Sequence, residues 1–232
     1  MNIAIIPARG GSKRIPRKNI KAFHGKPMLA WAIETAKTSG LFEHIVVTTD
    51  DAQISDLAIA LGVEAPFVRP AELADDYTPT VPVIAHAITA CQALGWQFEH
   101  VCCIYPAVPF MQATDLVAAL QKLASGCADY VFPVAAFPSA IQRALRQLPN
   151  GLMKPFNDQF AATRTQDLEP AYYDAGQFYW GWKHAWLSGN NIHQHGEGLV
   201  IPSWRVVDID NAEDWQRAEL MHAVFNHPNG LA

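Results

Sequence analysis

The sequence lacks any long hydrophobic run. Its apolar segments fall well short of the roughly 18–20 residues that a membrane-spanning helix requires. The first of them, IAIIPA at 3–8, is too short for the hydrophobic region of a secretory signal peptide, and its basic residues follow it rather than precede it. We therefore expect a cytoplasmic protein that neither crosses nor binds a membrane.

Cysteine is scarce, and neither cysteine nor histidine is spaced for metal binding. The chain has four cysteines and no C-x-x-C pair, and Cys102 and Cys103 lie inside the apolar run HVCCIY, where thiols are usually buried. Among the nine histidines, His193 and His195 fall in a polar loop, where we expect both to be solvated. The sequence thus predicts neither a disulfide nor a zinc site.

Acidic residues are absent from residues 1–33. This segment holds seven of the 17 lysines and arginines, whereas all 22 aspartates and glutamates follow it, and the whole chain has a net charge of −5. The protein therefore carries a basic island on an otherwise acidic chain. Nucleic acid usually meets a broad basic face, so this distribution favours a small, highly charged anion and argues against a nucleic-acid partner.

The sequence does contain the alternation that is typical of an α/β protein. Its 232 residues are 50% hydrophobic and 17% charged, an ordinary globular composition for one or two domains. Short β-branched runs predict buried strands at 2–7, 44–49, 100–105 and 130–134. Helical periodicity separates these runs, and Asp51 is placed to cap a helix over 52–61. This order predicts a three-layer α/β/α fold with a mostly parallel, Rossmann-like sheet and right-handed crossovers.

The alternation breaks after about residue 137. The stretch RALRQLPNGLMKPF predicts a β-hairpin that turns at residues 149–151, because Pro, Asn and Gly favour tight turns. A polar, proline-bearing stretch and then the aromatic run GQFYWGWKHAW follow. We interpret residues 138–200 as an inserted excursion that forms a lid or an oligomer contact.

The alternation resumes near the C-terminus. The segment WRVVDID predicts a strand at 204–210, and a helix follows over 211–225. Residues 1–137 and 201–226 are therefore expected to form one α/β domain. The tail at 226–232 is expected to be frayed.

Five basic side chains follow the first predicted strand in the segment ARGGSKRIPRKN, namely Arg9, Lys13, Arg14, Arg17 and Lys18. The adjacent Gly10 and Gly11 allow positive φ and close approach of backbone N–H groups, which together would form an anion nest. Ligands of open α/β sheets collect at such strand ends. The segment matches neither G-x-x-x-x-G-K-[ST] nor G-x-G-x-x-G. We expect phosphate to bind here, and a solvated basic loop is the alternative.

The segment VVDIDNAED is a second candidate site. If it begins as a strand, its period of two places Asp208 and Asp210 on one face. Two carboxylates at a strand end suit Mg²⁺, which takes its remaining ligands from water and phosphate. Alternatively, Asp210 or Asn211 caps the last helix, and Glu213 or Asp214 completes a capping box. The residues alone leave both interpretations open.

Arg69 lies in another predicted strand-end loop, within FVRPAELADDYTPT. Its guanidinium could hold a carboxylate or phosphate with two parallel hydrogen bonds. It could equally form a salt bridge with Asp75 or Asp76, six or seven residues further on. The sequence does not separate these two possibilities.

Together, these segments resemble the acylneuraminate cytidylyltransferases, also called CMP-sialic acid synthetases. The ARGGSKRIPRKN loop resembles the first signature of that family, and RPAELADD and VDIDNAED match later ones in order, from about residue 1 to 225. The stretches CCIYPAVPF, YVFPVAAFPSAIQRA and TQDLEPAYYDAGQFYWG resemble the subgroup that activates pseudaminic acid. Where the sialic acid enzymes have Arg-x-Asn-Gly, this chain reads Tyr-Asp-Ala-Gly at 173–176, which favours a related nonulosonic acid over ordinary sialic acid.

The resemblance implies the nucleotidyltransferase form of the fold and a reaction. The enzyme would join CMP from CTP to a nine-carbon 2-keto sugar acid, most similar to pseudaminic acid, and release pyrophosphate. The CMP-sugar would serve surface or flagellar glycosylation. The resemblance further implies Mg²⁺ as cofactor and a homodimer, with residues 138–200 serving sugar binding and dimerisation.

The same resemblance assigns roles to individual residues. The residues that it implies for nucleotide binding are Ala8, Arg9, Gly10, Gly11, Ser12, Lys13, Asn19, Arg69 and Thr80. Arg9, Lys13 and Lys18 would be catalytic, because they would neutralise charge on the α-phosphate and the departing pyrophosphate. Mg²⁺ would be held by Asp208 and Asp210. The sugar would contact Tyr105, Gln166, Asp174 and Gln177.

Three other functions are compatible with parts of this pattern. The enzyme could activate another acidic sugar, such as legionaminic acid, N-acetylneuraminate or Kdo. The chain could be a non-catalytic nucleotide-binding module of the same fold, although a binder has no need of Asp208 and Asp210 beside phosphate. A nicotinamide-dependent oxidoreductase is disfavoured by the missing G-x-G-x-x-G.

Overall fold

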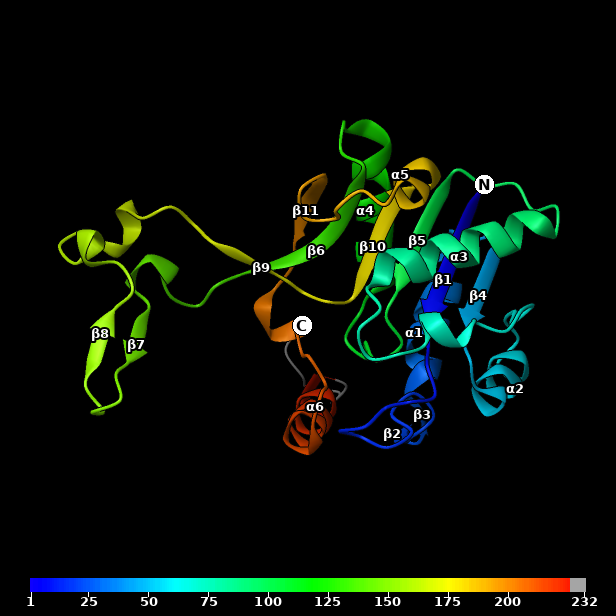
Figure 1. The fold of residues 1–232 in the computed structure, drawn as a ribbon, viewed down its shortest axis with the longest axis horizontal. Coiled ribbons are helices and arrows are strands. Elements are labelled where there is room, and N and C mark those ends of the chain that lie inside the picture. Colours follow the sequence, from blue (N-terminus) through cyan, green and yellow to red (C-terminus); the bar gives the residue numbers. More distant parts are fainter. Residues whose placement is uncertain (226–232) are drawn as a thin grey trace.

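Residues 1–225 are described by the computed structural model, in which helices flank a central sheet and one arm projects from its edge (Figure 1). The strands are β1 (Asn2–Pro7), β2 (Ala22–Phe23), β3 (Lys26–Pro27), β4 (His44–Thr48), β5 (His100–Ile104), β6 (Tyr130–Ala136), β7 (Leu145–Gln147), β8 (Met153–Pro155), β9 (Tyr172–Asp174), β10 (Phe178–Trp182) and β11 (Gly196–Val200). The helices are α1 (Met28–Ser39), α2 (Ala52–Ala60), α3 (Thr80–Ala93), α4 (Ala113–Ser125), α5 (Lys183–Ser188) and α6 (Ala212–Phe225). The frayed tail expected at 226–232 lies outside the described residues.

One mixed sheet forms the centre of the molecule. Its strands follow the order β11-β6-β10-β5-β1-β4, and β9 also pairs with β6. β1 lies parallel to both β5 and β4, and β11 lies parallel to β6, whereas β9 and β10 run antiparallel to their neighbours. The four predicted buried strands are β1, β4, β5 and β6. The predicted α/β sheet is therefore confirmed, with β9 and β10 as its antiparallel members.

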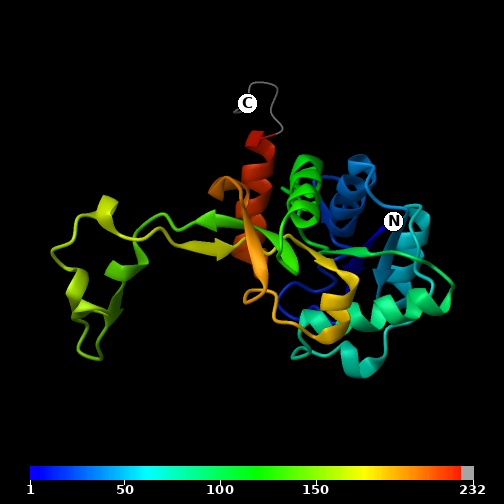
Figure 2. The same ribbon diagram turned by 90° about the horizontal axis from the view of Figure 1, so that it is seen from above.

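Helices cover both faces of this sheet, as Figure 2 shows from above. Along β1, Ala4 and Ile6 point toward the core under α1, α2 and α4, whereas Ile3 and Ile5 point toward the core under α3 and α5. This alternation is the period of two that a fully buried strand presents to two layers. None of the helices in residues 1–225 is long and apolar enough to cross a membrane. The three-layer prediction is confirmed.

An arm of residues 138–171 stands away from the sheet (Figures 1 and 2). It contains the hairpin of β7 and β8, which turns at Gly151 with φ +83°, as the sequence predicted. The remaining part of the predicted excursion returns to the sheet, because β10 pairs with β5 and β6 and β11 pairs with β6. The division into domains at 138–200 stays a prediction.

The strand predicted at 204–210 is wrong. Residues Ser203–Arg205 form a 3-10 turn, and the following residues up to 210 are extended without a partner strand. Ile201 donates the last backbone hydrogen bond to the sheet, to Val134 O at 2.8 Å. Arg205 then turns inward, where its guanidinium binds Asp115 at 2.6 and 3.1 Å. A buried ion pair, rather than strand pairing, therefore fixes this segment.

Candidate functional site

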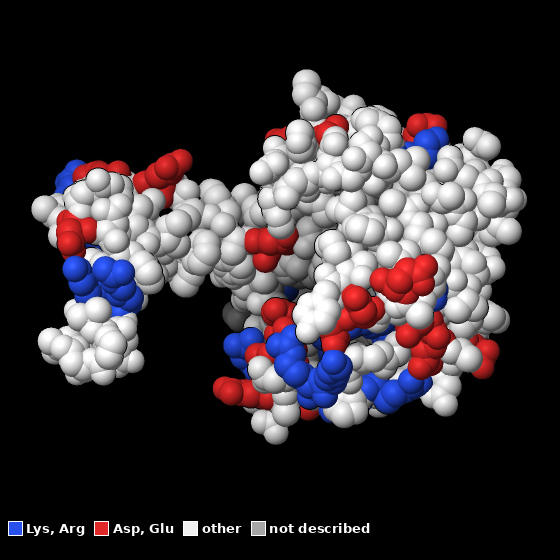
Figure 3. Space-filling view, in the orientation of Figure 1, with Lys and Arg blue, Asp and Glu red and all other residues white. Residues whose placement is uncertain are grey.

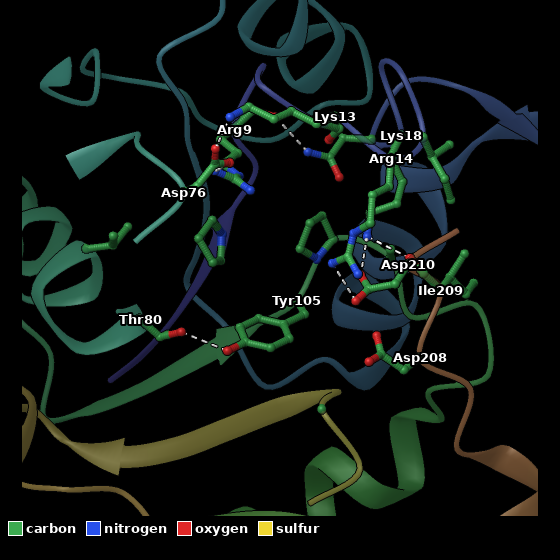
Figure 4. A pocket seen from close by; sticks show the side chains of 18 of the residues that line it. Arg9, Lys13, Arg14, Lys18, Asp76, Thr80, Tyr105, Asp208, Ile209 and Asp210 are labelled. Atoms are coloured by element: carbon green, nitrogen blue, oxygen red, sulfur yellow. Dashed lines mark hydrogen bonds and ion pairs between the residues drawn. The ribbon is translucent and has the colours of Figure 1, made fainter. Parts of the chain in front are cut away.

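A cavity of about 750 Å³ opens at the carboxyl ends of β1 and β5 (Figure 4). It is lined by the loop after β1, the loop before α3 and the start of α3, the loop after β5, the end of β9 and the turn after it, residues 206–210, and Arg217 of α6. Figure 3 shows a hollow in the main body, with Lys and Arg side chains gathered among Asp and Glu below it. Ligands of open α/β sheets bind at this end of the strands.

The loop after β1 is fixed at both ends. Ala8 is fully buried, and its N–H donates to Thr48 O at 3.0 Å, which continues the pairing of β1 with β4. Asn19 is also buried, and its side-chain amide donates to Arg9 O at 3.0 Å. The buried Oδ1 of Asn19 has no hydrogen-bond partner within residues 1–225. The side-chain amide of Asn19 thus holds the loop through its N–H group. Its carbonyl oxygen Oδ1 remains an unsatisfied acceptor at the edge of the cavity.

The glycines act differently from the prediction. Neither Gly10 nor Gly11 has positive φ, so the predicted left-handed nest is wrong. The N–H of Gly10 donates to Asp50 Oδ1 at 3.0 Å, and a Cβ built at Gly10 would lie 2.6 Å from Asp51 Oδ2. Gly10 is therefore needed for close packing against the start of α2. The left-handed residue of this loop is Arg17, with φ +57°.

Four of the five basic residues line the cavity, and each is paired with a carboxylate. On one side Asp76 binds Arg9 Nη1 at 2.6 Å and also binds Lys13, and these two cations hold the pKa of Asp76 below its usual value. On the other side Asp210 binds Arg14 at 2.7 Å and Lys18 at 3.5 Å. Figure 4 shows these two groups facing each other across the cavity.

Arg17 is the exception, because it points away from the cavity. Its guanidinium binds Asp51, the N-cap of α2, at 2.5 Å, and also the side chain of Gln53. It does not line the cavity. Arg17 therefore fixes the basic loop to α2, while the other four cations and Ser12 face the space where an anion would bind.

Asp208 and Asp210 lie on either side of the buried Ile209, and both line the cavity. Within residues 1–225 Asp208 makes no hydrogen bond or ion pair, and Asp210 binds Arg14 and Lys18. Desolvation and the negative charge of Asp210 raise the pKa of Asp208. A divalent cation would relieve this repulsion, and two oxygen ligands leave the positions that Mg²⁺ fills with water and phosphate. The pair therefore fits Mg²⁺.

The predicted capping of the last helix is also confirmed, by Asn211 and Asp214 of the same segment. The side chain of Asn211 accepts hydrogen bonds from the N–H groups of Glu213 and Asp214 at 2.9 and 3.0 Å. The carboxylate of Asp214 accepts in return from the N–H groups of Asp210 and Asn211, both at 3.1 Å. This reciprocal arrangement is a capping box. It leaves the carboxylates of Asp208 and Asp210 available to the cavity.

Arg69 is buried at the edge of the cavity, and its predicted salt bridge is wrong. Within the described chain it pairs with neither Asp75 nor Asp76; its guanidinium donates instead to the carbonyl and hydroxyl of Thr48. Burial lowers the pKa of Arg69 to about 10. A buried guanidinium without a carboxylate partner favours an anionic or electron-rich ligand nearby.

Thr80 and Tyr105 form the opposite end of the cavity (Figure 4). Their hydroxyl oxygens lie 2.7 Å apart and share one hydrogen bond. Burial raises the pKa of Tyr105 to about 12, so its hydroxyl stays protonated at neutral pH. This end is polar but carries no cation, in contrast to the basic loop.

Asp174 lines this end of the cavity as predicted, but two other predicted sugar residues do not. Gln177 is buried, and its amide donates to Arg205 O at 2.7 Å. It therefore holds the residue that precedes 206–210 and does not itself face the cavity. Gln166 is exposed in a 3-10 turn of the arm. The sequence motif thus predicted that Gln166 and Gln177 are polar residues of this region, but it did not predict the direction of their side chains.

The sequence did not single out several residues that the structure brings to the site. Arg217 of α6 lines the cavity and pairs with Asp214 at 3.3 Å. His193, which we expected to be solvated, is 62% exposed but donates to Asp174 Oδ2 at 2.7 Å. Arg217 lies three residues after Asp214 in α6, about one helical turn, and this spacing could have placed it near the site. No pattern in the sequence connects His193 with Asp174.

These features define a nucleotide-binding α/β protein of the nucleotidyltransferase class. A sequence model of the cytidylyltransferase family matches residues 3–177, and the chain belongs to this family. It is 40% identical over 231 residues, 99% of both chains, to the pseudaminic acid cytidylyltransferase of Campylobacter jejuni subsp. jejuni serotype O:23/36 (strain 81-176). It is 30% identical over 94% of both chains to the CMP-N,N'-diacetyllegionaminic acid synthase of Legionella pneumophila subsp. pneumophila.

Solved structures agree on the fold. The chain is similar to CMP:2-keto-3-deoxy-manno-octonic acid synthetase complexed with CTP, with a TM-score of 0.69 over 96% of this chain and 98% of that one, at 14% identity. It is also similar to 4-diphosphocytidyl-2C-methyl-D-erythritol synthase from Anaerococcus prevotii, with a TM-score of 0.61. The predicted family and the nucleotidyltransferase fold are confirmed.

Proposed function

We propose that this enzyme transfers CMP from CTP to pseudaminic acid and releases pyrophosphate, which supplies a CMP-sugar for surface or flagellar glycosylation. The observation that carries the proposal is 40% identity over 99% of both chains to a pseudaminic acid cytidylyltransferase. The cavity supports it, because one end presents four cations and the other a polar, cation-free surface. A reaction that consumes CTP also fits a cytoplasmic enzyme.

The basic loop would bind the triphosphate. In the reaction a sugar hydroxyl oxygen bonds to the α-phosphorus, the bond from that phosphorus to the bridging oxygen of the β-phosphate breaks, and the hydroxyl loses its proton. Negative charge grows on the departing pyrophosphate, where Arg9, Lys13 and Lys18 would stabilise it. Their ion pairs with Asp76 and Asp210 all reach solvent, and the exposed Lys13 exchanges its partner at small cost.

Mg²⁺ would be held by Asp208 and Asp210 and would polarise phosphate oxygens. Lys18 reaches the same place, because its ammonium also donates to Ile209 O at 2.7 Å. The side chain is thereby fixed between the two aspartates and the cavity. Residues 208–210 and Lys18 thus form one unit, built from the two ends of the chain.

The nucleoside would lie between the basic loop and Arg69. We propose that the loop contacts the nucleotide through its own backbone and short side chains. The residues concerned are Ala8, Gly10, Gly11, Ser12 and Asn19. Arg69 and Thr80 would contact the base or ribose, because both line the cavity beyond the loop. The unsatisfied Oδ1 of Asn19 can accept one hydrogen bond there.

The sugar would occupy the end formed by Tyr105 and Asp174. The carboxylate of a 2-keto acid is attached to the reacting anomeric carbon, so it lies near the α-phosphate and the cations. Asp174 would repel that carboxylate and attract donor groups at the far end of the sugar. This fixes one orientation of the sugar, with its acid group toward the basic loop and its amide or hydroxyl donors toward Asp174.

We also propose a homodimer formed through the arm. Four apolar side chains on the hairpin, Leu145, Leu152, Met153 and Phe156, are between 53% and 66% exposed, and exposed apolar patches mark protein–protein contacts. Replacing Leu152 and Phe156 with Asp is expected to give monomers in sedimentation velocity. The control Leu220→Asp, at an exposed position of α6, should sediment like the wild type. A wild type that sediments as a monomer would contradict this proposal.

The substrate is tested by pyrophosphate release. Wild-type enzyme with CTP and Mg²⁺ is given pseudaminic acid, N,N'-diacetyllegionaminic acid, N-acetylneuraminate and Kdo in parallel. We expect the highest kcat/KM with pseudaminic acid and no turnover when another nucleoside triphosphate replaces CTP. A clear preference for N-acetylneuraminate would overturn the sugar assignment, and no turnover with any sugar acid would overturn the activity.

A further inference from the structure

Asp174 is held by three hydrogen bonds from three different places. Its Oδ1 accepts from the N–H of Gly176 at 2.8 Å, and its Oδ2 accepts from the Tyr179 hydroxyl at 2.9 Å and from His193 Nε2 at 2.7 Å. Asp174 ends β9 and Tyr179 lies on β10, two strands that both pair with β6. The carboxylate is therefore clamped where the chain passes from one strand to the next.

Two of these donors are fixed by their own surroundings. Gly176 has φ +61°, which forms the tight turn after Asp174, and Tyr179 is buried with its pKa raised far above neutrality, so its hydroxyl is a permanent donor. His193 is different, because its side chain is 62% exposed. It comes from the loop before β11 and rests against the edge of Phe132 at a centroid distance of 5.3 Å.

The three hydrogen bonds decide what Asp174 can offer to the cavity. A carboxylate has about four lone-pair positions, so three donors leave one acceptor position. The group therefore accepts a single hydrogen bond from a ligand, in a direction set by the other three. Removing one donor frees the carboxylate to rotate and lets water occupy the released position.

We propose that His193 is a positioning residue for the sugar acid: it orients Asp174 so that the remaining acceptor position faces a donor group of the sugar. This inference rests on the proposed function, since it names how the same cavity recognises its second substrate. His193 itself does not line the cavity and touches the sugar only through Asp174. It belongs to the sugar side alone, away from the four cations of the basic loop.

The test compares two replacements that separate packing from hydrogen bonding. His193→Phe keeps a ring against Phe132 and removes the donor, whereas His193→Gln keeps an N–H donor near the position of Nε2. Because a hydrogen bond to a charged group is lost, we expect His193→Phe to raise the KM for pseudaminic acid about tenfold and to leave the KM for CTP and kcat within about twofold. His193→Gln should restore the sugar KM to within about threefold of the wild type.

The matched control is His195→Ala. His195 lies two residues away in the same loop, is 51% exposed, and faces Asp129 at 3.7 Å rather than Asp174. It should keep both KM values at the wild-type level. A His193→Phe enzyme with an unchanged sugar KM, or with equal rises in both KM values, would overturn the positioning role. Absence of turnover in the wild type with every sugar acid would instead overturn the proposed function, and this inference with it.

Discussion

The two ends of the cavity are built on opposite principles. The basic end comes from one continuous loop and residues 208–210, and two of its four cations are exposed: the side chains of Lys13 and Arg14 are 79% and 69% accessible. The sugar end gathers single residues from the start of α3, the loop after β5, β9, β10 and the loop before β11, and most of them are buried or half-buried. One end is a set of exchangeable ion pairs, and the other is a fixed hydrogen-bond network.

This difference suits the two substrates. A triphosphate brings four negative charges, so cations that exchange a carboxylate for phosphate bind it without a rigid template. Acidic sugars differ from one another in the placement of a few donor groups, and only groups held in fixed positions distinguish them. We therefore propose that the basic loop carries the phosphate chemistry and that the hydrogen-bond network at the other end selects the sugar.

The largest expected effect is at Lys18, which belongs to the basic loop and also contacts Asp210 of the proposed metal-binding pair. Lys18→Ala removes charge stabilisation from the transition state, so kcat for pyrophosphate release should fall by at least about 100-fold. The melting temperature should stay within a few degrees of the wild type. Lys21→Ala is the control, since Lys21 covers the Trp215 ring and does not line the cavity. Turnover like that of the wild type in Lys18→Ala would refute its role.

Asp208→Ala tests the metal side of the same end. The carboxylate has no protein partner within residues 1–225, so its removal should leave the fold intact and abolish most pyrophosphate release at millimolar Mg²⁺. Activity measured over a range of Mg²⁺ concentrations should show a higher requirement for the metal. If the variant keeps both the wild-type rate and the wild-type Mg²⁺ requirement, Asp208 does not hold the metal.

The support of the basic end is tested at the buried ion pair of Arg205 and Asp115, which positions residues 206–210. Arg205 and Asp115 are 7% and 12% exposed, so Arg205→Met leaves a buried carboxylate without a partner. We expect a loss of about 3 kcal/mol in the free energy of unfolding, measured with urea. The double variant Asp115→Leu/Arg205→Met should recover most of this loss. Equal stability of the single and double variants would show that the ion pair is not coupled in this way.

The smallest expected effect is a gain in affinity at the basic end. Asp76 occupies Arg9 and Lys13, so Asp76→Asn removes a competitor for phosphate and should lower the KM for CTP about threefold. Asp75→Asn is the control, because the Asp75 carboxylate binds Thr78 and the Tyr77 N–H instead of a cation. A higher KM for CTP in Asp76→Asn would show that Asp76 organises these cations rather than competing for them.

The sequence predicted the parts of this molecule that are local in the chain. The buried strands, the cap at Asp51 and the basic loop each occupy consecutive residues whose pattern carries the signal. The strand predicted at 204–210 was wrong because a distant partner, Asp115, draws Arg205 inward. Gly10 was chosen correctly as a special position, but packing against Asp51, and not positive φ, is the reason.

The sugar end was harder to predict for the same reason. Gln177 has the residue type that a sugar site uses. Its side-chain amide nevertheless donates to Arg205 O, because Gln177 packs against that residue just before β10. His193 reaches Asp174 only because both pack around β6. Such contacts depend on register between strands that are far apart in the chain, which periodicity and composition do not encode.

We propose that each end of the cavity recognises one substrate. The most direct measurement is the KM for CTP and the KM for pseudaminic acid in Asp174→Asn, a variant of nearly the same shape that replaces the acceptor oxygen with an amide. We expect a rise of about tenfold or more in the sugar KM, with the CTP KM within about twofold of the wild type. An unchanged sugar KM, or an equal rise in the CTP KM, would contradict it.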